Sequence, residues 1–185
     1  MAKIGLTNFR YSILTEGNDG TPSYNGAKTP AKAISFNADI TTNEAVLRAD
    51  DSDAESDYSF AYGNVTMGID EDDQTMLSDL LGHTLSDGLM VSKTTDVAPY
   101  VGLGRIITKM VGGNYKYTVV FYYKVKFSEP SETDQTMGET IEFNTYEISG
   151  RISALKNDKW RERKTFDSKA SAISYLEGLM ASGSV

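Results

Sequence analysis

The pattern of apolar and polar positions predicts a chain built mainly from β-strands. In residues 115–127 every odd-numbered position is apolar or aromatic, whereas three of the even-numbered positions are lysine. Strict alternation of this kind is typical of a strand. A second apolar run, Tyr100–Val111, precedes it, and Gly112 and Gly113 between the two runs suit a tight turn with positive φ. We therefore predict a long hairpin over residues 100–127.

Further strands are predicted along most of the remaining chain. Residues 146–155 alternate in the same way as the hairpin. Six other segments also have strand character: Phe9–Thr15, Ala33–Asp39, Glu44–Ala49, Tyr58–Ile69, Thr140–Phe143 and Trp160–Phe166. The chain is thus expected to be a mainly β protein.

Two short helices are predicted between these strands. The first begins at Asp70, whose carboxylate can cap the helix, and ends at Gly82. The second begins near Asp167 or Ser168. The apolar faces of the two helices are formed by Met76, Leu77, Leu80 and Leu81 in the first, and by Ala172, Ile173, Leu176, Leu179 and Met180 in the second.

Three long polar loops separate these elements: residues 17–30, 50–57 and 128–138. Loops of this length in a compact domain are usually functional or mobile. A chain of 185 residues is long enough for one domain with its own core, and we expect a single domain over residues 1–185 with a flexible tail at 181–185.

Composition narrows the classes of function. The net charge is -8, from 18 Lys and Arg against 26 Asp and Glu, which disfavours a protein that grips nucleic-acid phosphates. The absence of cysteine excludes disulfides and thiolate metal sites. No apolar run suggests a signal peptide or a membrane span, so we expect neither secretion nor membrane insertion.

The candidate catalytic and ligand-binding patterns of the sequence also have structural interpretations. His83 is the sole histidine and directly follows the glycine that ends the first helix, which favours a capping role over catalysis. An EF-hand starting at Asp51 would need glycine at Ser56 and glutamate at Tyr62, so a solvated acidic loop is the better interpretation of residues 50–57. We therefore expect no active site, cofactor or metal.

Two further patterns also favour a structural interpretation. Gly102 and Gly104 begin a dinucleotide-binding pattern, but Ile107 stands at its third glycine position. Tyrosines of the long hairpin could stack on sugars or bases, yet alternating tyrosines on strands more often pack cores and interfaces. On the residues alone, a carbohydrate-binding β-sandwich module and a small hydrolase with an unrecognised carboxylate pair stay open.

The order of several unusual strings resembles the major tail proteins of siphophages of the phi13 type. The chain opens with KIGLTNFRYSIL and continues with APYVGLGRI, followed by a hairpin ending in KVKFSEPSE. MGETIEFNTYEISGRI then precedes the short C-terminal helix. The resemblance runs from Lys3 to Leu179.

This resemblance implies a fold and a function. The fold would be an antiparallel β-sandwich or half-barrel with a flanking helix, similar to the tube proteins of contractile tails and of type VI secretion. Subunits of this family form six-fold rings that stack into a hollow tube for DNA, together with tape measure, tail terminator and distal tail proteins. The protein would be part of the virion, assembled in the bacterial cytoplasm, with no enzymatic activity and no membrane association.

Within such a tube, particular residues can be given expected places. A lumen of negative or neutral character would let DNA slide without tight binding, and we assign Glu142 and Glu147 to it. The loop after the long hairpin is expected to reach a neighbouring subunit, with its contact residues Ser128, Glu129, Pro130, Ser131, Glu132 and Gly138.

Overall fold

The predicted long hairpin forms the centre of the sheet in the computed structural model, which describes residues 2–30, 33–49, 52–70, 73–131 and 146–181. Strands β7 (Val101–Val111) and β8 (Asn114–Phe127) pair along their length. Gly112 and Gly113 join them with φ values of 57° and 81°. This turn needs glycine because L side chains rarely adopt such backbone angles.

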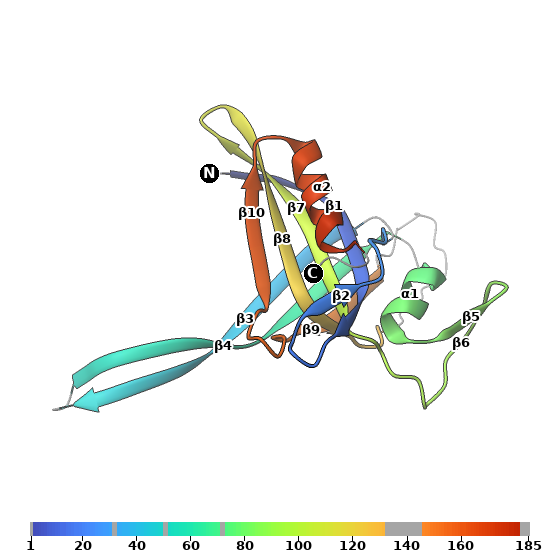
Figure 1. The fold of residues 1–185 in the computed structure, drawn as a ribbon, viewed down its shortest axis with the longest axis horizontal. Coiled ribbons are helices and arrows are strands. Elements are labelled where there is room, and N and C mark those ends of the chain that lie inside the picture. The colour runs from blue at the N-terminus through green and yellow to red at the C-terminus, as the bar shows by residue number, and fades with distance from the viewer. Residues whose placement is uncertain (1, 31–32, 50–51, 71–72, 132–145, 182–185) are drawn as a thin grey trace, which may run out of the picture.

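The other strands extend the sheet on both sides, and every pairing among the described strands is antiparallel. The sheet order is β2-β1-β7-β8-β9-β4-β3, and β10 also pairs with β8 (Figure 1). The bounds of these strands are β1 Ala2–Glu16, β2 Pro22–Tyr24, β3 Ala33–Ala49, β4 Ser52–Ile69, β9 Tyr146–Ile152 and β10 Arg161–Phe166. The expected class, mainly β with two helices, is confirmed.

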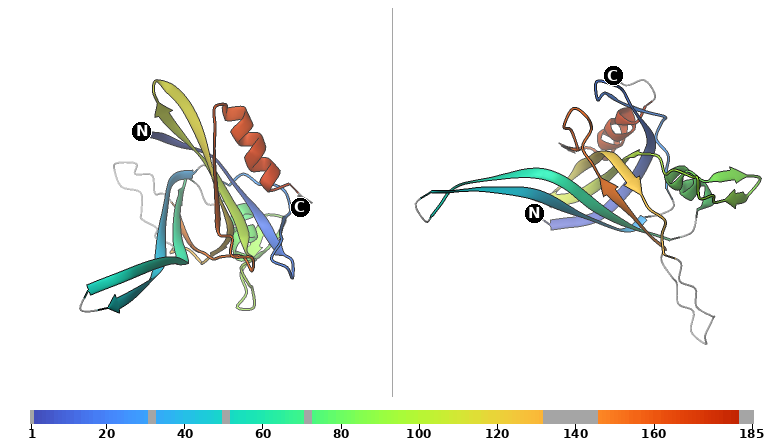
Figure 2. Two further views of the ribbon diagram at one scale, coloured as in Figure 1. Left: turned by 60° about the vertical axis from the view of Figure 1, so that its left-hand side comes forward. Right: turned by 90° about the horizontal axis from the view of Figure 1, so that it is seen from below.

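The sheet curls so that its two ends approach each other. β1 lies next to one end of the main sheet order and β3 lies at the other end, yet the rings of Phe9 and Phe36 are 5.3 Å apart. Phe36 also stacks on Tyr122 of the central strand β8, at 6.1 Å. The inner face therefore encloses a core, as a half-barrel does (Figure 2).

Each face of the central hairpin is covered by a different helix. Helix α1 (Gln74–Leu81) contributes its four apolar residues to the inner core. Helix α2 (Lys169–Leu179) lies on the outer face and buries Ala172 and Leu176 against β7 and β8. Both faces of β8 are thus buried from Thr118 to Tyr122. Neither of the two described helices is long and apolar enough to cross a membrane.

The predicted start of α2 is correct, whereas the predicted start of α1 is too early. The N-cap of α2 is Ser168, as predicted. The N-cap of α1 is Asp73 and not Asp70, because the Asp73 carboxylate accepts hydrogen bonds from the amides of Thr75 and Met76 at 2.9 and 3.4 Å. Gly82 ends α1 with φ 80°, as predicted.

The expected uniform alternation of β8 is wrong, because a β-bulge interrupts it. Between the pairs Val101–Val125 and Leu103–Tyr122, β8 contains one residue more than β7. Phe121 therefore packs on the outer face, whereas Val125 packs in the inner core, although both are odd-numbered. An extra residue in one strand reverses the side on which later side chains lie.

Within the predicted acidic loop 50–57, residues 52–57 belong to strand β4 and not to a loop, and residues 50 and 51 lie outside the described residues. The two strands predicted at Ala33–Asp39 and Glu44–Ala49 are one continuous strand, β3. Pairing between β3 and β4 holds this segment extended up to the pair Ala49–Ser52. Residues 17–30 are mostly irregular, as predicted, apart from β2.

One small hairpin was missed by the sequence analysis. Strands β5 (Thr84–Ser86) and β6 (Leu89–Val91) pair with each other and form a separate two-stranded sheet. Asp87 and Gly88 form its turn with φ values of 50° and 79°. The Asp-Gly dipeptide was the signal for this hairpin.

Candidate functional site

The outer half of the β3–β4 hairpin, residues 41–60, extends away from the body of the protein, and we call it the arm (Figures 1 and 2). Every residue from Thr41 to Glu44 is exposed, so both faces of β3 meet solvent there. On β4, the Tyr58 side chain is 60% exposed and its hydroxyl donates to Glu44 at 2.8 Å. A two-stranded hairpin without other packing is marginally stable in water.

Aromatic stacking anchors the arm at its base. The ring of Phe60 lies 4.3 Å from that of Trp160, with an angle of 7° between the ring planes. The Arg151 guanidinium lies 4.0 Å from the centre of the Tyr62 ring. The arm therefore leaves the body from a fixed base.

The arm is strongly acidic in sequence. Residues 41–60 contain six carboxylates and one base, Arg48. Such a charge excess favours association with a basic surface.

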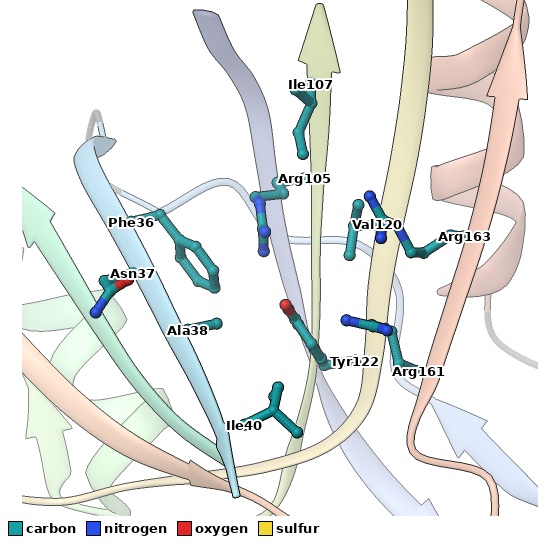
Figure 3. A pocket seen from close by; sticks show the side chains of 10 residues that line it. All are labelled: Phe36, Asn37, Ala38, Ile40, Arg105, Ile107, Val120, Tyr122, Arg161 and Arg163. Atoms are coloured by element: carbon teal, nitrogen blue, oxygen red, sulfur yellow. The ribbon is translucent and has the colours of Figure 1, made fainter. Parts of the chain in front are cut away.

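A basic pocket lies between β3 and the face formed by β7, β8 and β10 (Figure 3). Its volume is about 230 Å³, and three of its lining residues are arginines: Arg105 of β7, and Arg161 and Arg163 of β10. Phe36 and Tyr122 line its walls, and none of its lining residues is acidic. We call this space the arginine pocket.

The Arg105 guanidinium is held against aromatic rings inside this pocket. Its Cζ atom lies 3.8 Å from the centre of the Phe36 ring and 5.4 Å from that of Tyr122. Burial lowers the pKa of Arg105; Tyr122 opposes this shift, and the nearby charges of Arg163 and Arg161 add to it.

Sequence reasoning missed the arginine pocket, although two signals for it were present. Arg105 occupies a core-facing position of β7, between Leu103 and Ile107. Arg161 and Arg163 are two residues apart and so share one face of β10. What the sequence could not show is that β10 pairs with β8 and thereby brings these three arginines together.

Of the two predicted lumen residues, Glu147 belongs to the described part of the chain and Glu142 does not. Glu147 is exposed on β9, on the face opposite to the buried Ile148 and Ile152. Its assignment to a lumen stays a prediction.

The predicted subunit-contact loop begins close to the end of β8. The Ser128 amide and hydroxyl both donate to the Ser149 carbonyl, at 2.9 and 3.1 Å. Pro130 and Ser131 follow without regular secondary structure, whereas Glu132 and Gly138 lie outside the described residues.

Glu129 of this loop contacts His83, which ties three segments together. His83 Nδ1 lies 2.9 Å from Asp96 Oδ2, and His83 Nε2 lies 2.6 Å from Glu129 Oε1. The hydrogen bond to Asp96 raises the pKa of His83, burial opposes this, and Glu129 raises the pKa further. The cap of α1 is formed by the backbone of Gly82, so the side chain of His83 joins the α1 exit to the two loops.

The chain has a structural likeness to a phage tail-type protein, at low sequence identity. No protein-family model matches the sequence, and no curated protein matches it. A cryo-EM structure described as the anti-feeding prophage cap, a tube-terminating cap, has a TM-score of 0.49 and 9% sequence identity to this chain. The match covers 90% of this chain and 95% of that one. At this level of similarity, function has to be inferred from the chain's own residues.

Proposed function

We propose that this protein is the tail tube subunit of a siphophage, which assembles into six-fold rings that stack into a tube for DNA. The proposal rests on the order of the strings between Lys3 and Leu179, which resembles the phi13-type major tail proteins. The curled antiparallel sheet with a helix on its outer face is the architecture that this resemblance implies. The tape measure, tail terminator and distal tail proteins would be its partners in the virion.

The structural observation that carries the proposal is the arm. Its strand β3 ends the main sheet order, and both of its faces meet solvent at Thr41–Glu44. An exposed hairpin of this length is poorly stable alone and its free edge invites pairing with another chain. Packing against a neighbouring copy in a ring or stack would stabilise the hairpin and would cover its free edge.

The charge of the chain suits a conduit for DNA. Lysine or arginine side chains along a tube would bind phosphates, and such contacts add up along the duplex. Exposed Glu147 on β9 supports a lumen that repels its cargo. A ring reconstruction with Glu147 on the outer surface of the tube would contradict this assignment.

Replacement of the arm tests the proposal. Residues 43–59 are exchanged for Asn-Gly, which preserves the pair Thr42–Phe60 and closes the hairpin with a two-residue turn. Because the core contacts of β3 and β4 lie nearer the body, the variant is expected to fold with a nearly unchanged melting temperature. It should form neither rings nor tubes in negative-stain microscopy, whereas the unaltered protein is expected to form them.

A control variant removes one of the six carboxylates of the arm without shortening it. Glu44→Gln keeps the hairpin and should still assemble, since one exposed carboxylate contributes little. Tubes formed by the arm-replaced protein would contradict a role for the arm in assembly. Monomers formed by the unaltered protein at high concentration, even with a tail initiator complex, would contradict the proposed function itself.

A further inference from the structure

The arginine pocket contains a buried donor atom that the described residues leave without a hydrogen-bond partner. This atom is Nη1 of Arg105. Within the same part of the chain, neither Arg105, Arg161 nor Arg163 forms an ion pair with a carboxylate. A buried donor without a partner costs roughly 1–3 kcal/mol, and more when it is charged.

Stacking on Phe36 accounts for the position of Arg105 but not for the whole cluster. A cation over an aromatic ring is stabilised by the face of the ring, so the ring does not satisfy the N–H donors at the edge of the guanidinium. A hydrogen bond with Tyr122 raises the pKa of Arg105, but its Nη1 atom has no partner among the described residues. Arg161 and Arg163 then add positive charge beside a guanidinium that already lacks a counter-ion. Figure 3 shows the side chains of Arg105 and Arg161 converging beside Tyr122.

We propose that the arginine pocket binds one oxyanion, a carboxylate or a phosphate group, between Arg105, Arg161 and Arg163. Guanidinium groups present paired donors that match the oxygens of these groups. A volume of about 230 Å³ is smaller than the roughly 300–1,000 Å³ of pockets for drug-sized ligands, so a small anion or a single side chain fits better.

Two sources can supply this oxyanion. One is a free anion such as inorganic phosphate. The other is an acidic side chain of a second copy of this chain, for which the arm offers six carboxylates in its sequence. The chemistry of recognition is the same in both cases, and the experiment separates them.

The first measurement is phosphate binding to the unassembled protein by isothermal titration calorimetry at low salt. Arg105→Met keeps much of the stem that packs on Phe36, and Arg163→Gln changes an exposed residue that the fold does not require. Each variant should weaken phosphate binding about tenfold or more, since a hydrogen bond to a charged group contributes roughly 1.5–3 kcal/mol.

Lys164→Gln is the matched control. Lys164 is the next residue on β10 and lies over the Tyr175 ring on the opposite face, 4.5 Å from its centre. The substitution removes the same formal charge without touching the pocket, so phosphate affinity should stay within about twofold of the unaltered protein. Melting temperatures of all variants show that each one is folded.

The second measurement is self-association by sedimentation velocity, with and without phosphate. If a carboxylate of a second copy is the ligand, phosphate should inhibit association, and Arg105→Met and Arg163→Gln should associate less than Lys164→Gln. If a free anion is the ligand, phosphate should bind and leave association unchanged. The proposal is overturned if phosphate affinity and association are the same in the two pocket variants as in Lys164→Gln.

Discussion

Gly104, in the middle of β7, leaves the space in which α2 lies on the sheet. A Cβ atom at this position would overlap the Leu176 side chain and would lie 3.1 Å from the Phe121 ring. Gly104→Val should therefore lower the free energy of unfolding by about 1–3 kcal/mol, as overpacking of a core does. Chemical denaturation measures this change.

Gly178 provides the control for this prediction. It lies within α2, and an added Cβ would meet nothing within 4 Å. Gly178→Ala should leave stability unchanged or raise it by up to about 1 kcal/mol, because alanine favours a helix over glycine. Equal stability of the Gly104→Val protein and the unaltered one would contradict the close docking of α2.

His83 makes stability depend on pH. Its folded-state pKa is raised above the ordinary 6.5, so its contribution is fully present below pH 6.5 and is lost as pH rises through the folded-state value. The stability difference between the unaltered protein and His83→Gln should therefore shrink as pH is raised from about 6 through the folded-state pKa of His83, because histidine then becomes neutral in both states. Thermal denaturation over this pH range measures it.

Asp96→Asn identifies the cause of this effect. The hydrogen bond with Asp96 is the largest cause of the raised pKa of His83, so this substitution should bring that pKa closer to the ordinary value. The loss of stability should then begin at a lower pH. A difference between His83→Gln and the unaltered protein that grows with pH would be the opposite of the expected sign.

At the scale of elements, local pattern predicted the central hairpin and both helices but not the extent of the arm. Gly112, Gly113 and the alternation around them are local signals, and they were sufficient for β7 and β8. The polar residues Thr41–Asn43 and the acidic residues at 50–57 resemble loop sequences instead. Pairing of β3 with β4 overrides this weak local preference.

The change of side along β8 could not be predicted from local pattern either. The sequence of residues 115–127 alternates without interruption, whereas the bulge arises from pairing with β7. Its consequence is that Phe121 serves the outer core and Val125 the inner one. Register between strands is set by the partner strand and the core together.

At the scale of the whole molecule, the acidic arm extends away from the body that holds the arginine pocket (Figure 1). The arm contains six acidic residues and one basic residue, whereas the pocket is lined by three arginines and no acidic residue. The negative net charge follows from the sequence, but the pocket does not. Arg105 and Arg163 are 58 positions apart (163 minus 105) and come together only because β10 pairs with β8. This separation suits a subunit that contacts copies of itself.

Cryo-EM of the purified protein after assembly tests the central claim most directly. The account predicts hollow tubes of stacked six-fold rings in which the arm of each subunit contacts a neighbouring copy. Monomers, or closed oligomers in which the arm stays free in solvent, would contradict it.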